Sequence, residues 1–125
     1  MIVGLGIDLV ENRRVEQEVA RGDWLAGDGI FTSEEINYCR RAKKPGLRFA
    51  ACFAAKEATL KALGVAPDDL GFFREAEVRA GRDGRCGIVL HRRLGAQGER
   101  LGVRQIRLAM ASSTKLTGAM VILEA

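Results

Sequence analysis

The sequence has few of the residues on which common metal and redox sites depend. It contains one histidine, and no Asp or Cys lies at ligand spacing around His91, so a histidine-based zinc site is not expected. Its three cysteines form no Cys-x-x-Cys pair, and an odd, widely spaced set predicts free thiols in a reducing cytosol: Cys39, Cys52 and Cys86. We therefore expect a cytoplasmic protein.

Membrane and nucleic-acid signals are also missing. No apolar stretch approaches the about 20 residues that span a bilayer, and no basic segment with an apolar core precedes the first strand. Aromatic residues make up 6% of the chain and do not alternate with the basic pairs, as a stacking surface for bases requires. Gly4 and Gly6 do not complete a dinucleotide-binding fingerprint, because Leu9 occupies the third glycine position. Neither a membrane nor a nucleic acid is an expected partner.

The 125 residues, 47% of them hydrophobic, predict one domain over 1–125. Residue patterns predict strands over 2–10, 75–80, 86–91, 104–111 and 117–124, and helices over 12–20, 33–42, 47–63 and 92–101. Asp83-Gly84 favours a hairpin between the second and third strands, and 22–29 and 65–71 are expected to be loops. This order indicates an α+β fold, in which a mostly antiparallel sheet packs against the long alanine-rich helix.

Asp8 is the most informative residue, because it interrupts the apolar run from Ile2 to Val10. That run predicts a mostly buried strand, in which a carboxylate without a partner is costly. A hard metal ion would offset this cost. Alternatively, Asp8 ends the strand and caps the helix that follows.

A second carboxylate comes from the alanine-rich segment 47–63, which strongly favours helix and ends before Gly64. Glu57 and Lys61 are four residues apart and therefore share a face of this helix with Phe53. A carboxylate and an ammonium thus project side by side. An ordinary exposed ion pair between them is the simpler interpretation of this spacing.

Together, two separated motifs resemble those of the holo-[acyl-carrier-protein] synthases, the small bacterial 4'-phosphopantetheinyl transferases. The motifs are Gly6-Ile7-Asp8-Leu9-Val10-Glu11 and Phe53-Ala54-Ala55-Lys56-Glu57-Ala58, the second continued by Lys61-Ala62-Leu63-Gly64. The resemblance extends along the chain, through 30–39 and the hairpin at Asp83-Gly84-Arg85 to the last strand at 120–124. It implies transfer of the phosphopantetheine arm of coenzyme A to a serine of an acyl carrier protein, with release of adenosine 3',5'-bisphosphate.

The resemblance also implies particular roles for residues of this chain. Asp8 and Glu57 would hold Mg²⁺ against the coenzyme A diphosphate, an arrangement that suits an ion with few protein ligands. Lys61 would stabilise charge on the leaving bisphosphate, so Asp8, Glu57 and Lys61 are the expected catalytic residues. Contacts with coenzyme A are expected at Lys61, Gly64, Arg85 and Ser112. The proton of the carrier serine could pass to Glu57 through a metal-bound water or to that water as hydroxide.

Four positions depart from the family pattern. Cys52 replaces a usual arginine, Cys86 a common proline, Ala109 a hydroxyl residue and Ser112 a usual histidine. Ser112-Ser113-Thr114 is most simply a polar turn, although its hydroxyls could reach a phosphate. These departures motivate an alternative function, a non-catalytic relative that still binds coenzyme A or the carrier protein. The joint presence of Asp8, Glu57 and Lys61 favours the enzyme.

The net charge is +4, and basic pairs such as Arg13-Arg14 concentrate it locally. Such pairs suit an acidic partner. In the family that the chain resembles, the helix after the first strand docks the acidic carrier protein, so Arg14 is the first candidate contact and Arg13 the second. The same family forms trimers with the active site at the subunit boundary, which would allow a short chain to enclose coenzyme A. We therefore expect a homotrimer.

Overall fold

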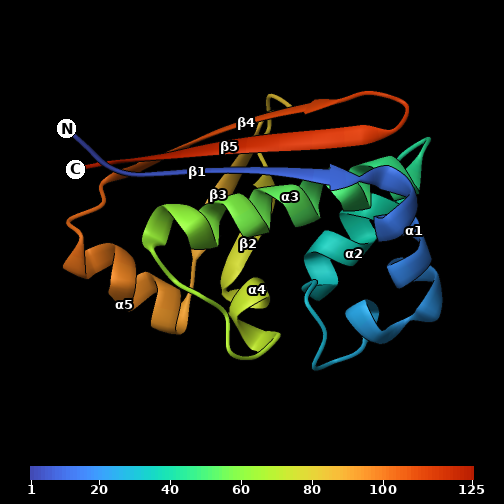
Figure 1. The fold of residues 1–125 in the computed structure, drawn as a ribbon, viewed down its shortest axis with the longest axis horizontal. Helices are drawn as coiled ribbons and strands as arrows, with labels where there is room; N and C mark the ends of the chain where they lie inside the picture. Colours follow the sequence, from blue (N-terminus) through green and yellow to red (C-terminus); the bar gives the residue numbers. More distant parts are fainter.

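The computed structural model describes all 125 residues and confirms the α+β class (Figure 1). Its elements follow the chain as β1 (Ile2–Glu11), α1 (Asn12–Arg21), the 3-10 helix η1 (Asp23–Leu25), α2 (Ser33–Arg40), α3 (Pro45–Leu63), α4 (Gly71–Glu75), β2 (Ala76–Ala80), β3 (Cys86–Leu90), α5 (Arg92–Arg100), β4 (Gln105–Ser112) and β5 (Leu116–Glu124). Every predicted strand and helix is present within two residues at each end. The short elements η1 and α4 were not predicted.

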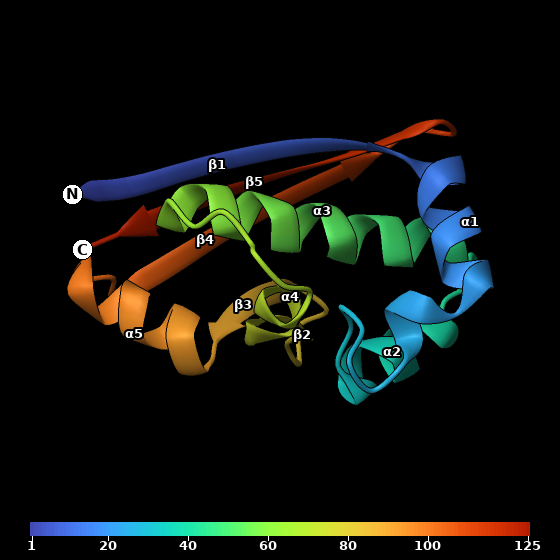
Figure 2. The same ribbon diagram turned by 60° about the horizontal axis from the view of Figure 1, so that its bottom comes forward.

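A three-stranded antiparallel sheet in the order β1-β5-β4 forms one layer of the molecule. The helix α3 runs along its inner face, and the hairpin of β2 and β3 forms a separate two-stranded sheet beyond α3 (Figure 2). The first and last strands pair along their whole lengths, with Asp8 opposite Ala119. Backbone hydrogen bonds join even Met1 and Ala125, with N···O distances of 2.8 Å and 3.2 Å.

The helix α3 forms the centre of the core because its alanines allow close packing. Pro45 occupies its first turn, and Gly64 ends it with a φ of 71°, a conformation that glycine adopts readily. A Cβ atom at Gly6 would lie 1.9 Å from the carbonyl oxygen of Ala58, and one at Gly4 would lie 2.3 Å from that of Ala62. The two glycines thus allow the backbone of β1 to lie directly against α3.

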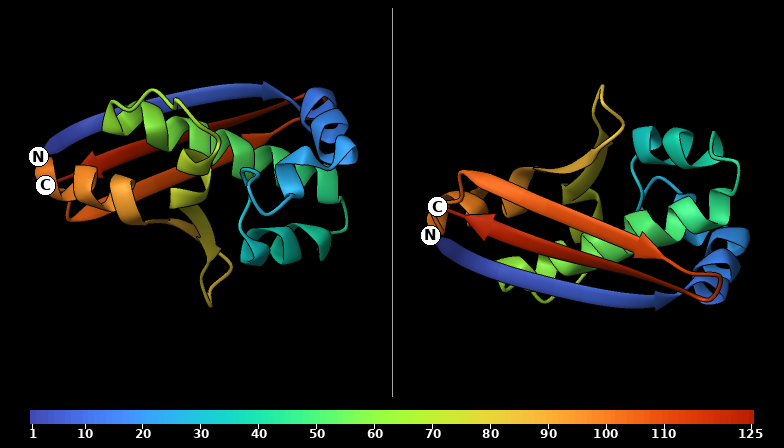
Figure 3. Two further views of the ribbon diagram at one scale, coloured as in Figure 1. Left: turned by 90° about the horizontal axis from the view of Figure 1, so that it is seen from below. Right: turned by 90° about the horizontal axis from the view of Figure 1, so that it is seen from above.

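The prediction that β1 is mostly buried was wrong for its outward-facing residues. Leu5, Ile7 and Leu9 are 62–68% exposed, whereas the inward-facing positions are Gly4, Gly6, Asp8 and Val10. The reason is that no helix covers the outer face of the sheet (Figure 3). We call the exposed apolar side chains on this side the outer face: Leu5, Ile7, Leu9, Leu116 and Met120.

Asp8 and His91 both lie close to the start of a helix, but only His91 occupies an N-cap. Asp8 does not end the strand or cap a helix, because β1 continues to Glu11 and Glu11 occupies the N-cap of α1 without a side-chain hydrogen bond. His91 does lie between a strand and a helix, as the N-cap of α5, and it contacts Glu77 at 3.1 Å. None of the helices combines the length and the apolarity that crossing a bilayer would demand.

Candidate active site

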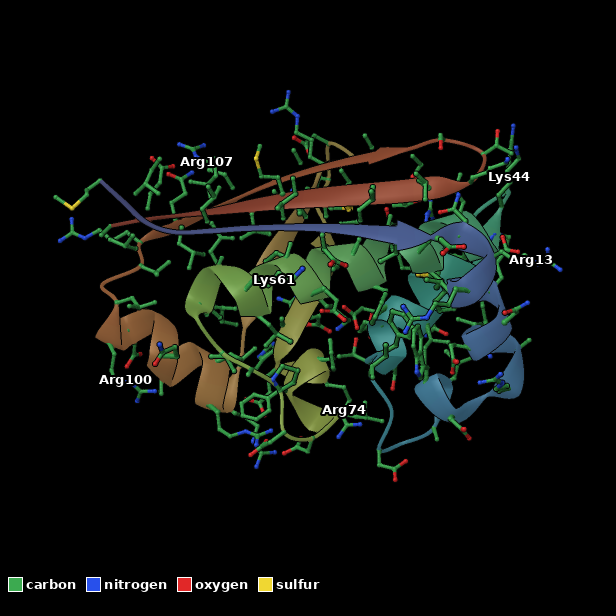
Figure 4. All side chains as sticks on the ribbon, in the orientation of Figure 1. Arg13, Lys44, Lys61, Arg74, Arg100 and Arg107 are labelled. Atoms are coloured by element: carbon green, nitrogen blue, oxygen red, sulfur yellow. The ribbon has the colours of Figure 1, made fainter.

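Asp8 and Lys61 meet where β1 crosses α3. The Lys61 ammonium donates to Asp8 Oδ1 at 2.9 Å and to the carbonyl oxygen of Ile7 at 3.2 Å. The Lys61 side chain remains 53% exposed, while that of Asp8 is 14% exposed. Figure 4 shows Lys61 on the flank of α3 beside β1. The Asp8 carboxylate is therefore mostly buried, and it contacts the Lys61 ammonium, which is accessible to solvent.

Glu57 lies one helical turn before Lys61 and is half-buried. Burial, followed by the negative charge of Asp8, raises the pKa of Glu57, and the positive charges of Lys61 and Arg14 oppose this shift. The hydrogen bond with Asp8 raises the pKa of Lys61 in turn. Two carboxylates that repel each other beside one ammonium form a site that is stabilised by an added cation.

The simple ion pair expected between Glu57 and Lys61 was a wrong interpretation of their spacing. Lys61 pairs with Asp8, and no salt bridge joins it to Glu57. The cause is the close approach of β1, which brings the Asp8 carboxylate within reach of the ammonium. Glu57 is therefore left without a charged partner in direct contact.

The carboxylates of Asp8 and Glu57 suit a hard divalent ion that takes its remaining ligands from water and from the substrate. No group of three or more His, Cys, Asp or Glu side chains is placed to hold a metal. Asp8 and Glu57 alone would offer two carboxylates, which is the usual protein share of a Mg²⁺ site completed by substrate phosphates and water. The residues present are therefore compatible with the expected ion.

A second group of residues surrounds a cavity of about 450 Å³ beside β4, at the sheet edge opposite β1. The Arg48 guanidinium lies 4.1 Å from the centre of the Tyr38 ring. A hydrogen bond with Cys86 is the largest cause that raises the pKa of Tyr38 to about 12. The polar and sulfur-bearing residues that line the cavity are Tyr38, Lys43, Lys44, Arg48, Cys52, Cys86, Met110 and Ser112.

Ser112 links this cavity to a neighbouring hollow of about 620 Å³ beside Lys44, Ser113 and Thr114. As predicted, the hydroxyl residues lead into a turn between the last two strands. The Ser112 hydroxyl lies 3.0 Å from that of Thr117. Lysine and arginine side chains around hydroxyl groups suit a phosphorylated ligand.

The four residues predicted to contact coenzyme A are not brought together within one chain. Lys61 lies in the last turn of α3, beside β1, and Gly64 caps the end of that helix. Ser112 ends β4, and the 89% exposed side chain of Arg85 belongs to the hairpin turn before β3. In Figure 3 this hairpin extends on the β4 side of the sheet. The predicted site is thus divided between opposite edges of one sheet.

Some candidate residues were missed by sequence reasoning. Tyr38 and Arg48 lie outside both motifs, and their contact depends on how α2 packs against α3. The only available signal was the accumulation of basic residues between 40 and 48. Cys39 and Cys52, predicted as free thiols, are both buried, with their sulfur atoms 3.6 Å apart.

Arg13 and Arg14 are both exposed on α1, directly after β1. Arg13 points away from the molecule (Figure 4). The charge of Arg14 lowers the pKa of Glu57, which places Arg14 on the side of the candidate active site. An acidic partner that docks on α1 would therefore lie near Glu57.

Comparisons with known proteins point to one family. The sequence model of the 4'-phosphopantetheinyl transferase superfamily matches residues 4–111. A holo-[acyl-carrier-protein] synthase of Koribacter versatilis is 38% identical over 125 residues, which cover 99% of each chain.

Solved structures give the same result. The holo-[acyl-carrier-protein] synthase of Neisseria meningitidis matches with a TM-score of 0.85 and 30% identity, covering 100% of both chains. The synthase of Bacillus anthracis, solved in complex with coenzyme A (3',5'-ADP), matches with a TM-score of 0.78 and 28% identity, covering 100% of this chain and 98% of that one.

Proposed function

The chain belongs to the 4'-phosphopantetheinyl transferase superfamily, and we propose that Asp8, Glu57 and Lys61 carry out its reaction. It is an enzyme of the holo-[acyl-carrier-protein] synthase type, which transfers the 4'-phosphopantetheine arm of coenzyme A to a serine of an apo acyl carrier protein. The observation that supports the site is the 2.9 Å contact between Lys61 and Asp8, with Glu57 one turn away on the same flank of α3.

In the proposed mechanism, Asp8 and Glu57 would hold Mg²⁺, and the bound ion would supply positive charge to offset that of the coenzyme A diphosphate. Lys61 is exposed on one side and fixed by Asp8 on the other, so its ammonium can stabilise charge on the leaving adenosine 3',5'-bisphosphate. The proton of the carrier serine would pass to Glu57 through a metal-bound water, or to that water as hydroxide. Positioning and charge neutralisation provide most of the acceleration.

The transfer and its metal dependence can be tested by intact mass spectrometry of an apo acyl carrier protein incubated with the enzyme and coenzyme A. With Mg²⁺ we expect one phosphopantetheine arm to be added, and with EDTA we expect no addition. Full modification in EDTA would disprove the metal assignment. Coenzyme A binding without modification of several carrier proteins would instead identify a non-catalytic relative.

We further propose that the working enzyme is a homotrimer. In one chain, Asp8, Glu57 and Lys61 lie at the β1 edge of the sheet, and the cavity that Ser112 lines lies at the β4 edge. Neither edge alone therefore offers all the expected coenzyme A contacts. A ring of three copies would place the β1 edge of each subunit beside the β4 edge of the next. Such an assembly would also cover the outer face, which a monomer leaves exposed to water.

Arg14 is the proposed main contact for the acidic carrier protein, with Arg13 as a weaker one. We expect Arg14→Glu to raise the KM for the carrier protein at least about tenfold and to leave the KM for coenzyme A unchanged, because only the protein substrate loses an attractive charge. Steady-state kinetics in which each substrate is varied in turn give the two KM values. The control is Arg100→Glu, on α5 (Figure 4). Equal increases in both KM values would indicate misfolding.

A cytoplasmic location is part of the same proposal. Its support is the set of three free thiols, which a reducing compartment preserves. Cell fractionation followed by alkylation of free thiols would test it, and recovery in an oxidising compartment would contradict it.

A further inference from the structure

We propose that Lys56 is a positioning residue, whose buried ammonium fixes the rotation of α3 and thereby aims Glu57 at the Asp8 side of the molecule. This inference rests on the proposed roles of Asp8 and Glu57. It assigns to the lysine of the Phe-Ala-Ala-Lys-Glu motif a role inside the protein, although a lysine next to a phosphate-handling glutamate would ordinarily be interpreted as a ligand contact.

The Lys56 ammonium has no free hydrogen-bond donor. Its side chain is 0% exposed, and it donates to Glu35 Oε1 at 2.7 Å, to the carbonyl oxygen of Phe73 at 2.7 Å and to that of Ala76 at 3.0 Å. A lysine ammonium has three N–H groups, and these three acceptors use all of them. Lys56 therefore cannot contact a phosphate without breaking a buried interaction.

Glu35 extends this anchor to two further backbone positions. Its side chain is also 0% exposed, and Oε1 accepts a hydrogen bond from the backbone N–H of Thr32 at 2.9 Å. Oε2 accepts one from the backbone N–H of Val78 at 2.7 Å. A single ion pair thus ties α3 to the start of α2, to the end of α4 and to β2.

The opposite flank of α3 is fixed by backbone contact with β1. Gly4 and Gly6 lie against the carbonyl oxygens of Ala62 and Ala58, which leaves no room for α3 to move toward β1. Lys56 and Glu57 are consecutive, so their side chains leave the helix about 100° apart. Loss of the anchor would remove the polar contacts that hold this flank of α3, and a small rotation of the helix would then displace the Glu57 carboxylate.

The Lys56 ammonium and the Glu35 carboxylate are both fully buried, with an N···O distance of 2.7 Å. The pair is therefore interdependent: each charge is tolerated inside the protein because the other is present. Changes at either residue should consequently have the same effect on the metal site, even though neither side chain reaches it.

The test compares Lys56→Met, Glu35→Gln and the double variant Lys56→Met/Glu35→Leu. The main readout is binding of Mn²⁺, followed by electron paramagnetic resonance in the presence of coenzyme A, with thermal unfolding and the KM for coenzyme A measured alongside. We expect each single variant to weaken Mn²⁺ binding about tenfold, as loss of supporting contacts around metal ligands commonly does. The double variant should be no weaker than the singles, because the two residues act as a unit.

Two results would overturn the proposal. A higher KM for coenzyme A in Lys56→Met, with Glu35→Gln unaffected, would mean that Lys56 contacts the substrate. A lower Tm with unchanged Mn²⁺ affinity would mean that the ion pair only stabilises the fold. If Lys56→Met does not fold, the nearly isosteric Glu35→Gln decides, and Glu99→Gln on α5 is its control. Ion binding by a wild-type protein that modifies no carrier would contradict the proposed function but not this role.

Discussion

Replacement of Glu57 by glutamine is expected to lower kcat/KM for phosphopantetheine transfer about a thousandfold, which corresponds to about 4 kcal/mol of transition-state stabilisation. The amide is neutral and a poor ligand for Mg²⁺, so the ion would be held by Asp8 alone. It also removes the candidate base. The rate of carrier modification, measured by intact mass spectrometry at saturating coenzyme A and several Mg²⁺ concentrations, gives the size of the effect.

A stability measurement separates lost chemistry from misfolding. Because the folded protein raises the pKa of Glu57, ionisation of this residue opposes folding in the absence of metal. That unfavourable contribution is present at neutral pH and disappears as the pH falls below the pKa of the unfolded chain. We therefore expect the metal-free Glu57→Gln protein to have a higher Tm than the wild type at pH 7 and an equal Tm once the carboxyl is protonated. Near-normal turnover at saturating Mg²⁺ would show that Glu57 does not hold the ion.

Replacement of Ile7 by lysine is expected to dissociate the proposed trimer and to reduce transfer at least about a hundredfold. The Ile7 side chain is 68% exposed in one chain and lies on the outer face, opposite Met120. Burying a lysine ammonium there without a partner would cost several kcal/mol in each of three interfaces. Light scattering after size-exclusion chromatography measures the mass, and the transfer assay measures the activity.

The matched control is Leu70→Lys, which places the same charge on an exposed leucine away from the outer face. This variant should keep both the assembly and the activity. A monomeric Ile7→Lys protein with full activity would show that one chain contains the complete site. A wild-type protein that is monomeric at assay concentration would contradict the trimer directly.

Much of the fold follows from local patterns whose physical cause is simple. Alanine-rich composition and Gly64 predict both the existence and the end of α3, and Asp83-Gly84 predicts the hairpin turn. Asp8 was predicted as a candidate because it interrupts an apolar run, and Glu57 because it shares a helix face with Lys61 within a motif that resembles that of the family. These patterns involve residues that are close together in sequence, so they can be recognised from one amino-acid sequence.

The remaining features depend on contacts that sequence spacing cannot show. Lys61 pairs with Asp8, and not with Glu57, because two glycines bring a distant strand against its helix. The apolar run of β1 looks like a strand covered on both faces, yet a sheet of the same sequence can leave one face for another subunit. Whether the second face is covered within the chain or by another subunit depends on the assembly, and the hydrophobic pattern carries no information about the assembly.

The pairing of β1 with β5 also affects how the chain reaches its native state. Residues 2–11 of β1 form their hydrogen bonds with residues 116–124 of β5, a partner far away in the sequence. The three-stranded sheet therefore cannot close before β5 has been synthesised. Contacts between such distant parts of a sequence slow folding, because the chain loses much entropy before they form. The nascent protein thus depends on its helices for early structure, and the sheet is completed only after β5 is available to pair with β1.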